Sequence, residues 1–143
     1  MKVPGGVLVD TSVWISFFRK GRSPEARHLD GLLELGTVVT CAPIRAEVVS
    51  GAKTEGEFRQ IRDLFSGLQV LESSQEVWDR LEAARFTLAR RGIQASLIDL
   101  MIGSLSQIYH VPLWSLDKDF DRIRPVLSFP KYIPEPASLR SSD

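Results

Sequence analysis

Short apolar runs alternate with segments of helical periodicity along this chain, and that alternation constrains the fold more than any other feature. The runs are apolar at nearly every position and rich in β-branched residues, as in VLV and TVVTC. Strands of this kind are buried on both faces, which is typical of a parallel sheet covered by helices on either side. We therefore predict an α/β fold, a three-layer α/β/α sandwich around a parallel sheet. Five candidate strands lie at 7–9, 37–41, 69–71, 111–116 and 126–129.

Helix start signals stand between these runs. Thr54, Ser73 and Ser96 each lie three residues before an acid, which is the spacing of a capping box. Ser23 followed by Pro24 is a second kind of helix start, with a cap and a first helical residue. The predicted helices cover about 13–20, 24–35, 43–51, 55–68, 74–91, 97–108 and 119–124.

Length and composition narrow the class of protein. The chain has 143 residues, which fits one domain over 1–143, with a Pro- and Ser-rich tail over 130–143 that we expect to be partly flexible. No apolar run approaches the roughly 20 residues that span a bilayer, and the start lacks a signal-peptide pattern, so we expect a cytoplasmic protein without a membrane partner. Cys41 is the single cysteine, and His28 and His110 lie far apart, so neither a disulfide nor a zinc cluster is expected.

The formal net charge of the chain is zero. This balance counts against a protein that coats nucleic acid by bulk charge. It does not exclude a nuclease, because local fields matter more than the sum.

Four acids fall where a parallel sheet would bring them to one edge. Asp10 ends the first apolar run and Asp117 follows the fourth, while Glu47 and Asp99 lie on helices beside the second and fourth. Ligands of such sheets bind outside the carboxyl ends of the strands. Gathered carboxylates are unfavourable unless a cation neutralises them, and Mg²⁺ or Mn²⁺ prefers oxygen ligands. The pattern indicates a site for a divalent cation.

Each acid also has a structural explanation. Asp10 could cap the helix that follows it, and Glu47 could be an ordinary exposed helix residue. Asp99 has capping-box spacing to Ser96, and turn chemistry explains at least one aspartate of D-K-D-F-D. What favours a functional role is that the acids occupy positions able to face one site.

Four motifs together carry a family resemblance. They resemble the PIN domain and, more narrowly, the VapC toxins of bacterial toxin–antitoxin pairs, from Val7 to about Phe129. One departure is that Ser115 stands where threonine is commoner, and another is the extension MKVPGG before the first strand. The motifs are V-D-T-S at 9–12, P-I-R-A-E-V-V-S-G at 43–51, I-D-L-M-I-G-S-L-S at 98–106 and W-S-L-D-K-D-F at 114–120.

The resemblance implies a single PIN-like nuclease domain that hydrolyses RNA phosphodiester bonds at an acidic Mg²⁺ or Mn²⁺ site. By position, the catalytic acids are Asp10, Glu47, Asp99 and Asp117. The metal ligands are Asp10, Asp99, Asp117 and Asp119.

The resemblance also implies supporting residues around these acids. Ser12 and Ser115 match small polar residues that support the cluster. Because carboxylates repel phosphate, basic residues must help to attract RNA; Arg45 is a candidate for substrate binding, as are Arg19 and Lys20.

Two partners besides RNA follow from the same resemblance. One is a VapB-like antitoxin that offers an Arg or Lys to the acidic groove. The other is a second copy of the chain, in a homodimer to which Trp14, Phe17 or Phe18 could contribute, although core packing is the simpler explanation for most of these side chains.

Two other functions compete with the nuclease. A phosphoacceptor domain of the receiver type also places acids at strand ends, and Lys118 could be its lysine, but Thr11 stands where it would carry a second acid. A non-catalytic RNA- or protein-binding module on the PIN fold would be favoured by a missing acid, and none is missing.

Overall fold

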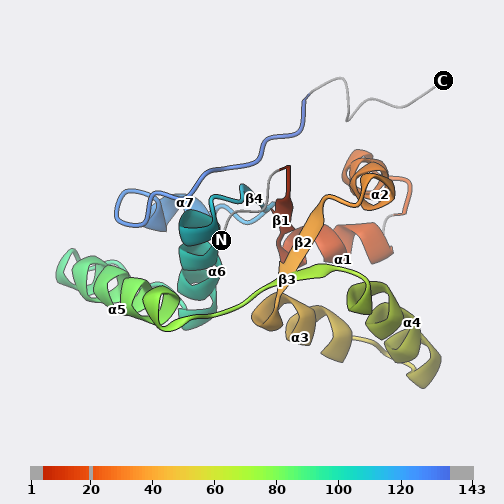
Figure 1. Cartoon of the computed structure of the whole chain (residues 1–143), viewed down its shortest axis with the longest axis horizontal. Helices are drawn as coiled ribbons and strands as arrows, with labels where there is room; N and C mark the ends of the chain where they lie inside the picture. The colour runs from red at the N-terminus through yellow and green to blue at the C-terminus, as the bar shows by residue number, and fades with distance from the viewer. Residues whose placement is uncertain (1–4, 20, 136–143) are drawn as a thin grey trace.

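A parallel four-stranded sheet lies at the centre of the protein. A computed structural model describes residues 5–19 and 21–135 (Figure 1). The sheet has the order β3-β2-β1-β4, and all of its pairings are parallel. Because the chain leaves β1 for β2 on one side and later adds β4 on the other, the carboxyl end of β1 is where such a sheet binds ligands. The strands are β1 (Val7–Val9), β2 (Val38–Cys41), β3 (Gln69–Leu71) and β4 (Leu113–Trp114).

Helices cover both sides of the sheet and give the predicted three layers. In Figure 1, α5 and α6 lie on one side, and α1, α2 and α4 lie on the other. Within these layers α5 packs on α6, α1 on α2, and α3 on α4. No helix in the described ranges is long and apolar enough to cross a membrane. The helices are α1 (Thr11–Arg19), α2 (Pro24–Leu35), α3 (Ala42–Ser50), α4 (Glu55–Ser66), α5 (Gln75–Arg90), α6 (Leu97–Tyr109) and α7 (Asp119–Ile123).

Side-chain caps begin several helices as the sequence predicted. The Thr54 hydroxyl accepts a hydrogen bond from the Glu57 amide at 3.1 Å, and the Ser96 hydroxyl accepts one from the Asp99 amide at 3.0 Å. Gly36 ends α2 in the left-handed conformation, with φ 72°. These local signals therefore fixed the helix ends in the expected places.

Two helix starts differ from the prediction. The first helix begins at Thr11 and not at Val13, because the Asp10 carbonyl already accepts the Val13 amide at 3.1 Å. The cap of α5 is Ser74 and not Ser73. The Ser73 hydroxyl instead contacts the Met101 sulfur at 3.3 Å, so the capping box predicted there is wrong.

The fifth strand predicted at 126–129 is also wrong. That segment turns, with the Leu127 amide bonded to the Ile123 carbonyl at 2.8 Å. Its apolar pattern has another cause, since Leu127 and Phe129 are buried against α6. The chain pairs with β4 only after this turn, through a single parallel bridge between Leu113 and Lys131.

The predicted tail is partly docked. The Tyr132 amide donates to the Leu113 carbonyl at 2.8 Å, and the Tyr132 hydroxyl lies 2.5 Å from His28 Nε2. Flexibility was predicted for 130–143, and 136–143 lies outside the described residues. The beginning of this segment therefore belongs to the folded part of the protein.

Helix α6 is the most apolar element of the core. Its residues 100–106 are all buried, and they bring Gly103 against the turn after α7. A Cβ atom at Gly103 would lie 3.0 Å from Leu127 Cδ2 and 3.4 Å from Phe129 Cδ1. The close approach of α6 to this turn thus depends on a residue without a side chain.

Replacing Gly103 with valine should lower the free energy of unfolding by about 1–3 kcal/mol, because the added methyl groups overfill the space beside Leu127. The same substitution at Gly31 is the control, since an added Cβ there meets no heavy atom within 4 Å. Valine at Gly31 should be neutral or slightly stabilising, because its helix propensity exceeds that of glycine. Urea unfolding curves measure both changes, and equal effects at the two sites would contradict this packing.

Candidate metal centre

Asp10 is held at the carboxyl end of β1 by contacts on both its backbone and its side chain. Its amide donates to the Trp114 carbonyl of β4 at 2.9 Å. Its carboxylate is buried, and Oδ2 accepts hydrogen bonds from the Ser12 and Ser115 hydroxyls, each at 2.8 Å. The Ser12 amide adds a longer contact of 3.3 Å to the same oxygen. Both serines that the family resemblance marked as supports therefore contact Asp10.

The two serine hydroxyls are oriented by backbone amides. The Ser12 hydroxyl accepts from the Leu116 amide at 2.9 Å, and the Ser115 hydroxyl accepts from the Asp117 amide at 3.0 Å. Both hydroxyls lie within donating distance of Asp10 Oδ2, and their oxygens are 3.2 Å from each other. All hydrogen bonds that the described residues make to this carboxylate end on Oδ2. Oδ1 therefore keeps its lone pairs for another ligand.

Three further aspartates converge near Asp10. One carboxylate oxygen from each of Asp99, Asp117 and Asp119 lies within 4.8 Å of the others. Asp99 comes from the first turn of α6, where Ser96 holds its amide, and Asp119 begins α7. The Asp119 amide donates to Asp117 Oδ1 at 2.9 Å, which fixes the turn between them. Residues far apart in the sequence thus form one acidic group.

The pKa of the Asp99 carboxyl reflects the burial and the negative charge of this group. Partial burial raises the pKa of its carboxyl above the usual value for aspartate, and the negative charges of Asp10, Asp117 and Asp119 raise it further. The hydrogen bond with Ser96 acts in the opposite direction but is outweighed. A cation placed among these carboxylates would relieve both the burial and the repulsion.

Glu47 reaches the same cleft from α3. A cavity of about 420 Å³ is lined by all four predicted catalytic acids, Asp10, Glu47, Asp99 and Asp117. The Thr11 hydroxyl donates to Glu47 Oε1 at 2.6 Å, and Thr11 is itself buried. Sequence reasoning missed this role of Thr11. Its only signal was a hydroxyl placed directly after a strand-ending acid.

The candidate basic residues lie elsewhere. Arg45 does not line the acidic cavity, and it lies two positions from Glu47, on a different face of α3. Arg19 lines a neighbouring hollow together with Lys53. Lys20 lies outside the described residues. Their proposed roles in RNA binding therefore receive no support from contacts with the acids.

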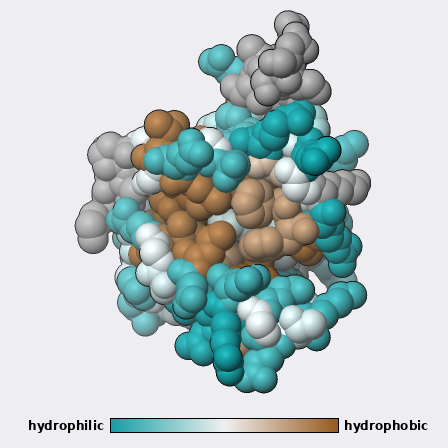
Figure 2. Space-filling view, turned by 90° about the vertical axis from the view of Figure 1, so that its right-hand side faces the viewer, coloured by the Kyte–Doolittle hydropathy of each residue, from teal (hydrophilic) through white to brown (hydrophobic). Residues whose placement is uncertain are grey.

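A second hollow adjoins the acidic cavity. It has a volume of about 570 Å³ and shares Thr11, Ile15 and Glu47 with the cavity. Its walls also include the exposed Phe18 of α1 and Ile61 of α4. Figure 2 shows a hollowed hydrophobic patch on the side of the molecule that carries α1 and α4.

The cysteine of the chain does not compete as a ligand. Cys41 ends β2 and is fully buried. Burial raises the pKa of its thiol to about 12, so the thiol stays protonated at neutral pH. The side-chain atoms that could coordinate a metal in the acidic cavity are therefore oxygens, the ligands that a hard cation prefers.

Sequence comparison finds relatives of one family. The family model described as PIN domain matches residues 7–125. A protein named VapC ribonuclease Mb1587, from Mycobacterium bovis, is 31% identical over 121 residues, which cover 82% of this chain and 90% of that relative. Ribonuclease VapC11 from Mycobacterium tuberculosis has the same identity and coverage.

Solved structures share the fold. The crystal structure of VapBC2 from Rickettsia felis, bound to a promoter DNA fragment, matches with a TM-score of 0.70 at 21% identity, covering 85% of this chain and 94% of that one. The DNA-bound VapBC structure from Salmonella typhimurium matches with a TM-score of 0.69 at 21% identity, covering 82% and 92%. The similarity confirms the predicted α/β architecture, with four strands in place of about five.

Replacing Asp99 with asparagine should raise the free energy of unfolding at pH 7 in a buffer with a metal chelator. Because the folded-state pKa of Asp99 is raised, its contribution to stability is present below the ordinary pKa and lost as the pH rises through the raised value. The gain from the substitution should therefore be largest at neutral pH and vanish below about pH 4.

Chemical denaturation across this pH range measures the effect of Asp99→Asn. Asp63→Asn, on the exposed face of α4, is the matched control and should change little. Destabilisation by Asp99→Asn at pH 7 in the chelating buffer would contradict the repulsion described for the acidic group.

Proposed function

Because this chain belongs to the PIN domain family, we propose that it is a Mg²⁺- or Mn²⁺-dependent endoribonuclease that acts in the cytoplasm as the toxin of a toxin–antitoxin pair. The observation that carries the proposal is the convergence of Asp10, Glu47, Asp99 and Asp117 on one cavity at the carboxyl edge of the sheet. The relatives from Mycobacterium are named as ribonucleases, and their likeness covers most of both chains.

The residues at this edge fit a hard divalent cation. Oδ1 of Asp10 is left open by the contacts that hold Oδ2, and Asp99 and Asp117 face the same cavity. Asp119 completes the acidic group from the exposed side. Asp10, Asp99 and Asp117 would hold the cation most directly, with Asp119 as a further ligand. A bound cation supplies Lewis acidity, which lowers the pKa of water and offsets charge on a phosphodiester.

The remaining residues orient these groups and the attacking water. Ser12 and Ser115 fix the Asp10 carboxylate, so its free oxygen needs no reorganisation when charge develops. Thr11 occupies Glu47 Oε1, which leaves Oε2 to accept a hydrogen bond from a water in the cavity. In-line attack of that water on phosphorus would break the bond to O3′. The products would carry a 5′-phosphate and a 3′-hydroxyl.

An antitoxin partner fits the surface beside the cleft. The hollow that contains Ile15 and Phe18 combines apolar and charged lining residues and lies next to the acidic cavity, with which it shares Thr11, Ile15 and Glu47. We propose that a segment of a VapB-like antitoxin packs in this hollow and places a basic side chain at the acids, which complements their charge. The structural neighbours from Rickettsia felis and Salmonella typhimurium are VapBC complexes.

The predicted homodimer stays a prediction, and the three aromatic residues suggested for it differ. Trp14 is fully buried in the core, and Phe17 is partly buried against it. Phe18 is 43% exposed and lines the proposed antitoxin hollow. Core packing therefore accounts for Trp14, and Phe18 is the one of the three that is exposed enough to meet a partner.

Cleavage of single-stranded and structured RNA tests the nuclease. We expect cleavage with Mg²⁺ or Mn²⁺, none with a chelator, and a loss of at least about 100-fold for Asp10→Asn and for Asp99→Asn. Asp63→Asn is the matched control and should keep the wild-type rate. End-group analysis of the products should find 5′-phosphates.

Three outcomes would contradict the nuclease. Cleavage that survives the chelator or both aspartate substitutions would remove the metal-carboxylate mechanism. Binding of RNA without cleavage would favour the non-catalytic module. Phosphorylation of Asp10 by a small phosphodonor would favour receiver-type chemistry, although the family assignment speaks against it.

Replacing Phe18 with glutamate should weaken inhibition by a VapB-like antitoxin encoded beside the gene by at least about tenfold, because the substitution removes an exposed aromatic contact and places a charge beneath the bound segment. RNA cleavage by the free variant should stay unchanged, since Phe18 does not line the acidic cavity. Titration of the antitoxin into the cleavage assay measures the effect. Trp78→Glu, at an aromatic side chain of α5 that is as exposed as Phe18 and lines neither the acidic cavity nor the hollows beside it, is the control, and equal inhibition of both variants would place the antitoxin elsewhere.

A further inference from the structure

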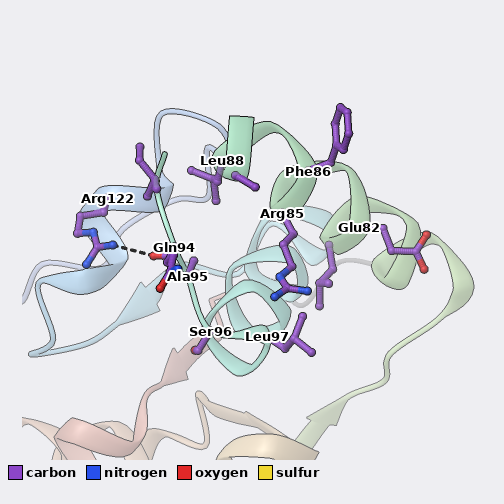
Figure 3. A pocket seen from close by; sticks show the side chains of 12 residues that line it. Glu82, Arg85, Phe86, Leu88, Gln94, Ala95, Ser96, Leu97 and Arg122 are labelled. Atoms are coloured by element: carbon purple, nitrogen blue, oxygen red, sulfur yellow. Dashed lines mark hydrogen bonds between the residues drawn. The ribbon is translucent and has the colours of Figure 1, made fainter. Parts of the chain in front are cut away.

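A hollow on the far side of α6 from the antitoxin surface adjoins the acidic cavity. Its volume is about 920 Å³, and it lies between α5 and the segment that leads into α6 (Figure 3). Ser96 lines both this hollow and the acidic cavity, so the two lie next to each other at that residue. Ile93, which is half-buried, and Leu97, which is exposed, give the hollow an accessible apolar lining, whereas Leu81 and Leu88 of the same lining are buried in the core. A ligand that leaves the acidic cavity past Ser96 would enter this space.

Arg122 connects the hollow to the acidic group. Its guanidinium donates to the Gln94 carbonyl at 2.7 Å, as Figure 3 shows, and lies 3.8 Å from Asp119 Oδ1. The side chain thereby ties the segment before α6 to α7. Because its guanidinium already contacts Gln94 and Asp119, Arg122 links the segment before α6 to α7 and is not available as a free cation.

Arg85 is the second cation of the hollow, and it has no such contacts. In Figure 3 its guanidinium points toward the side of the hollow where Ser96 and Leu97 lie. Within the described part of the chain it forms neither a hydrogen bond nor an ion pair. Glu82 also borders the hollow but points away from it in the same view and forms no ion pair with Arg85 there. An uncompensated guanidinium is therefore presented to whatever occupies the hollow.

We propose that this hollow binds the RNA strand on one side of the cleaved bond, with Arg85 on a backbone phosphate and the apolar lining under a base. The inference rests on the ribonuclease function proposed above. Acidic residues at the metal centre repel the phosphates that flank the scissile one, so a cation is needed close to the centre, and Arg45 does not supply it.

The chemistry of the hollow favours a single strand over a duplex. A guanidinium fork matches phosphate oxygens in a bidentate contact. Apolar side chains can receive an unstacked base, which an RNA duplex does not offer. The combination of one free arginine and an apolar lining that includes Ile93 and Leu97 suits a nucleotide of a strand that continues toward the acids.

Arg85→Gln tests the proposal in cleavage of a fluorescein-labelled single-stranded RNA with Mg²⁺ or Mn²⁺. Losing one charge-assisted contact at an exposed site should raise KM about 5- to 20-fold and leave kcat within twofold. Anisotropy of the same RNA in chelating buffer should give a slope of log K against log salt that is smaller by about 0.7, the value for one phosphate contact on a single strand.

Two variants separate phosphate binding from a general effect. Arg85→Lys keeps the charge and loses the fork, so it should keep the salt slope and fall between the other two in KM. Arg62→Gln on α4, an exposed arginine on the other side of the sheet, is the matched control and should behave as the wild type.

The results that overturn the proposal are distinct from those that overturn the nuclease. The Arg85 proposal fails if Arg85→Gln matches Arg62→Gln in both KM and salt slope, or if kcat falls while KM is unchanged. It also fails if Arg85→Gln binds RNA as the wild type does but sediments as a smaller species than the wild type. That result would make the hollow an interface between copies. If the wild type binds RNA but never cleaves it, the nuclease fails while the anisotropy comparison still tests Arg85.

Discussion

The hydrogen bonds on Asp10 Oδ2 are the interaction on which the rest of the site depends. Ser12 lies in α1, directly after β1, and Ser115 follows β4. Their two hydroxyls both bond to Asp10 Oδ2 and so join the ends of these neighbouring parallel strands. The amides of Leu116 and Asp117 in turn orient these hydroxyls, which couples the loop carrying the later acids to Asp10. These hydrogen bonds leave Asp10 Oδ1 open and also fix the position of the loop that carries Asp117.

The carboxylates of the acidic group repel one another, and packing in the surrounding fold offsets this repulsion. Burial and three neighbouring carboxylates raise the pKa of Asp99, so the repulsion acts against the folded state at neutral pH. The buried residues 100–106 of α6 hold Asp99 in place despite this repulsion, because the burial of their apolar side chains in the core fixes the helix that carries it. A bound cation would reduce the repulsion among the carboxylates and so stabilise the folded state. This gain in stability is typical of a binding site.

Sequence patterns predicted the elements well where the signal was local. The strand at 7–9 and the caps at Thr54 and Ser96 depend on neighbours within a few positions, and the structure has them. The fifth strand was wrong because an apolar run is equally produced by a turn that buries Leu127 and Phe129. The hydrogen bond between Thr11 and Glu47 joins residues 36 positions apart, so no local pattern contained it. Asp10, Asp99 and Asp117 were found because each stands beside a recognisable strand or helix start, whereas Glu47 lies inside α3 and was assigned its role through the family resemblance.

Anomalous diffraction from crystals grown with Mn²⁺ would show whether these carboxylates hold a divalent cation. We expect an Mn²⁺ peak in contact with Asp10 and Asp99 in the wild-type protein, and no peak there in Asp10→Asn. An absence of Mn²⁺ from the acidic group in the wild type, or an unchanged peak in Asp10→Asn, would contradict it.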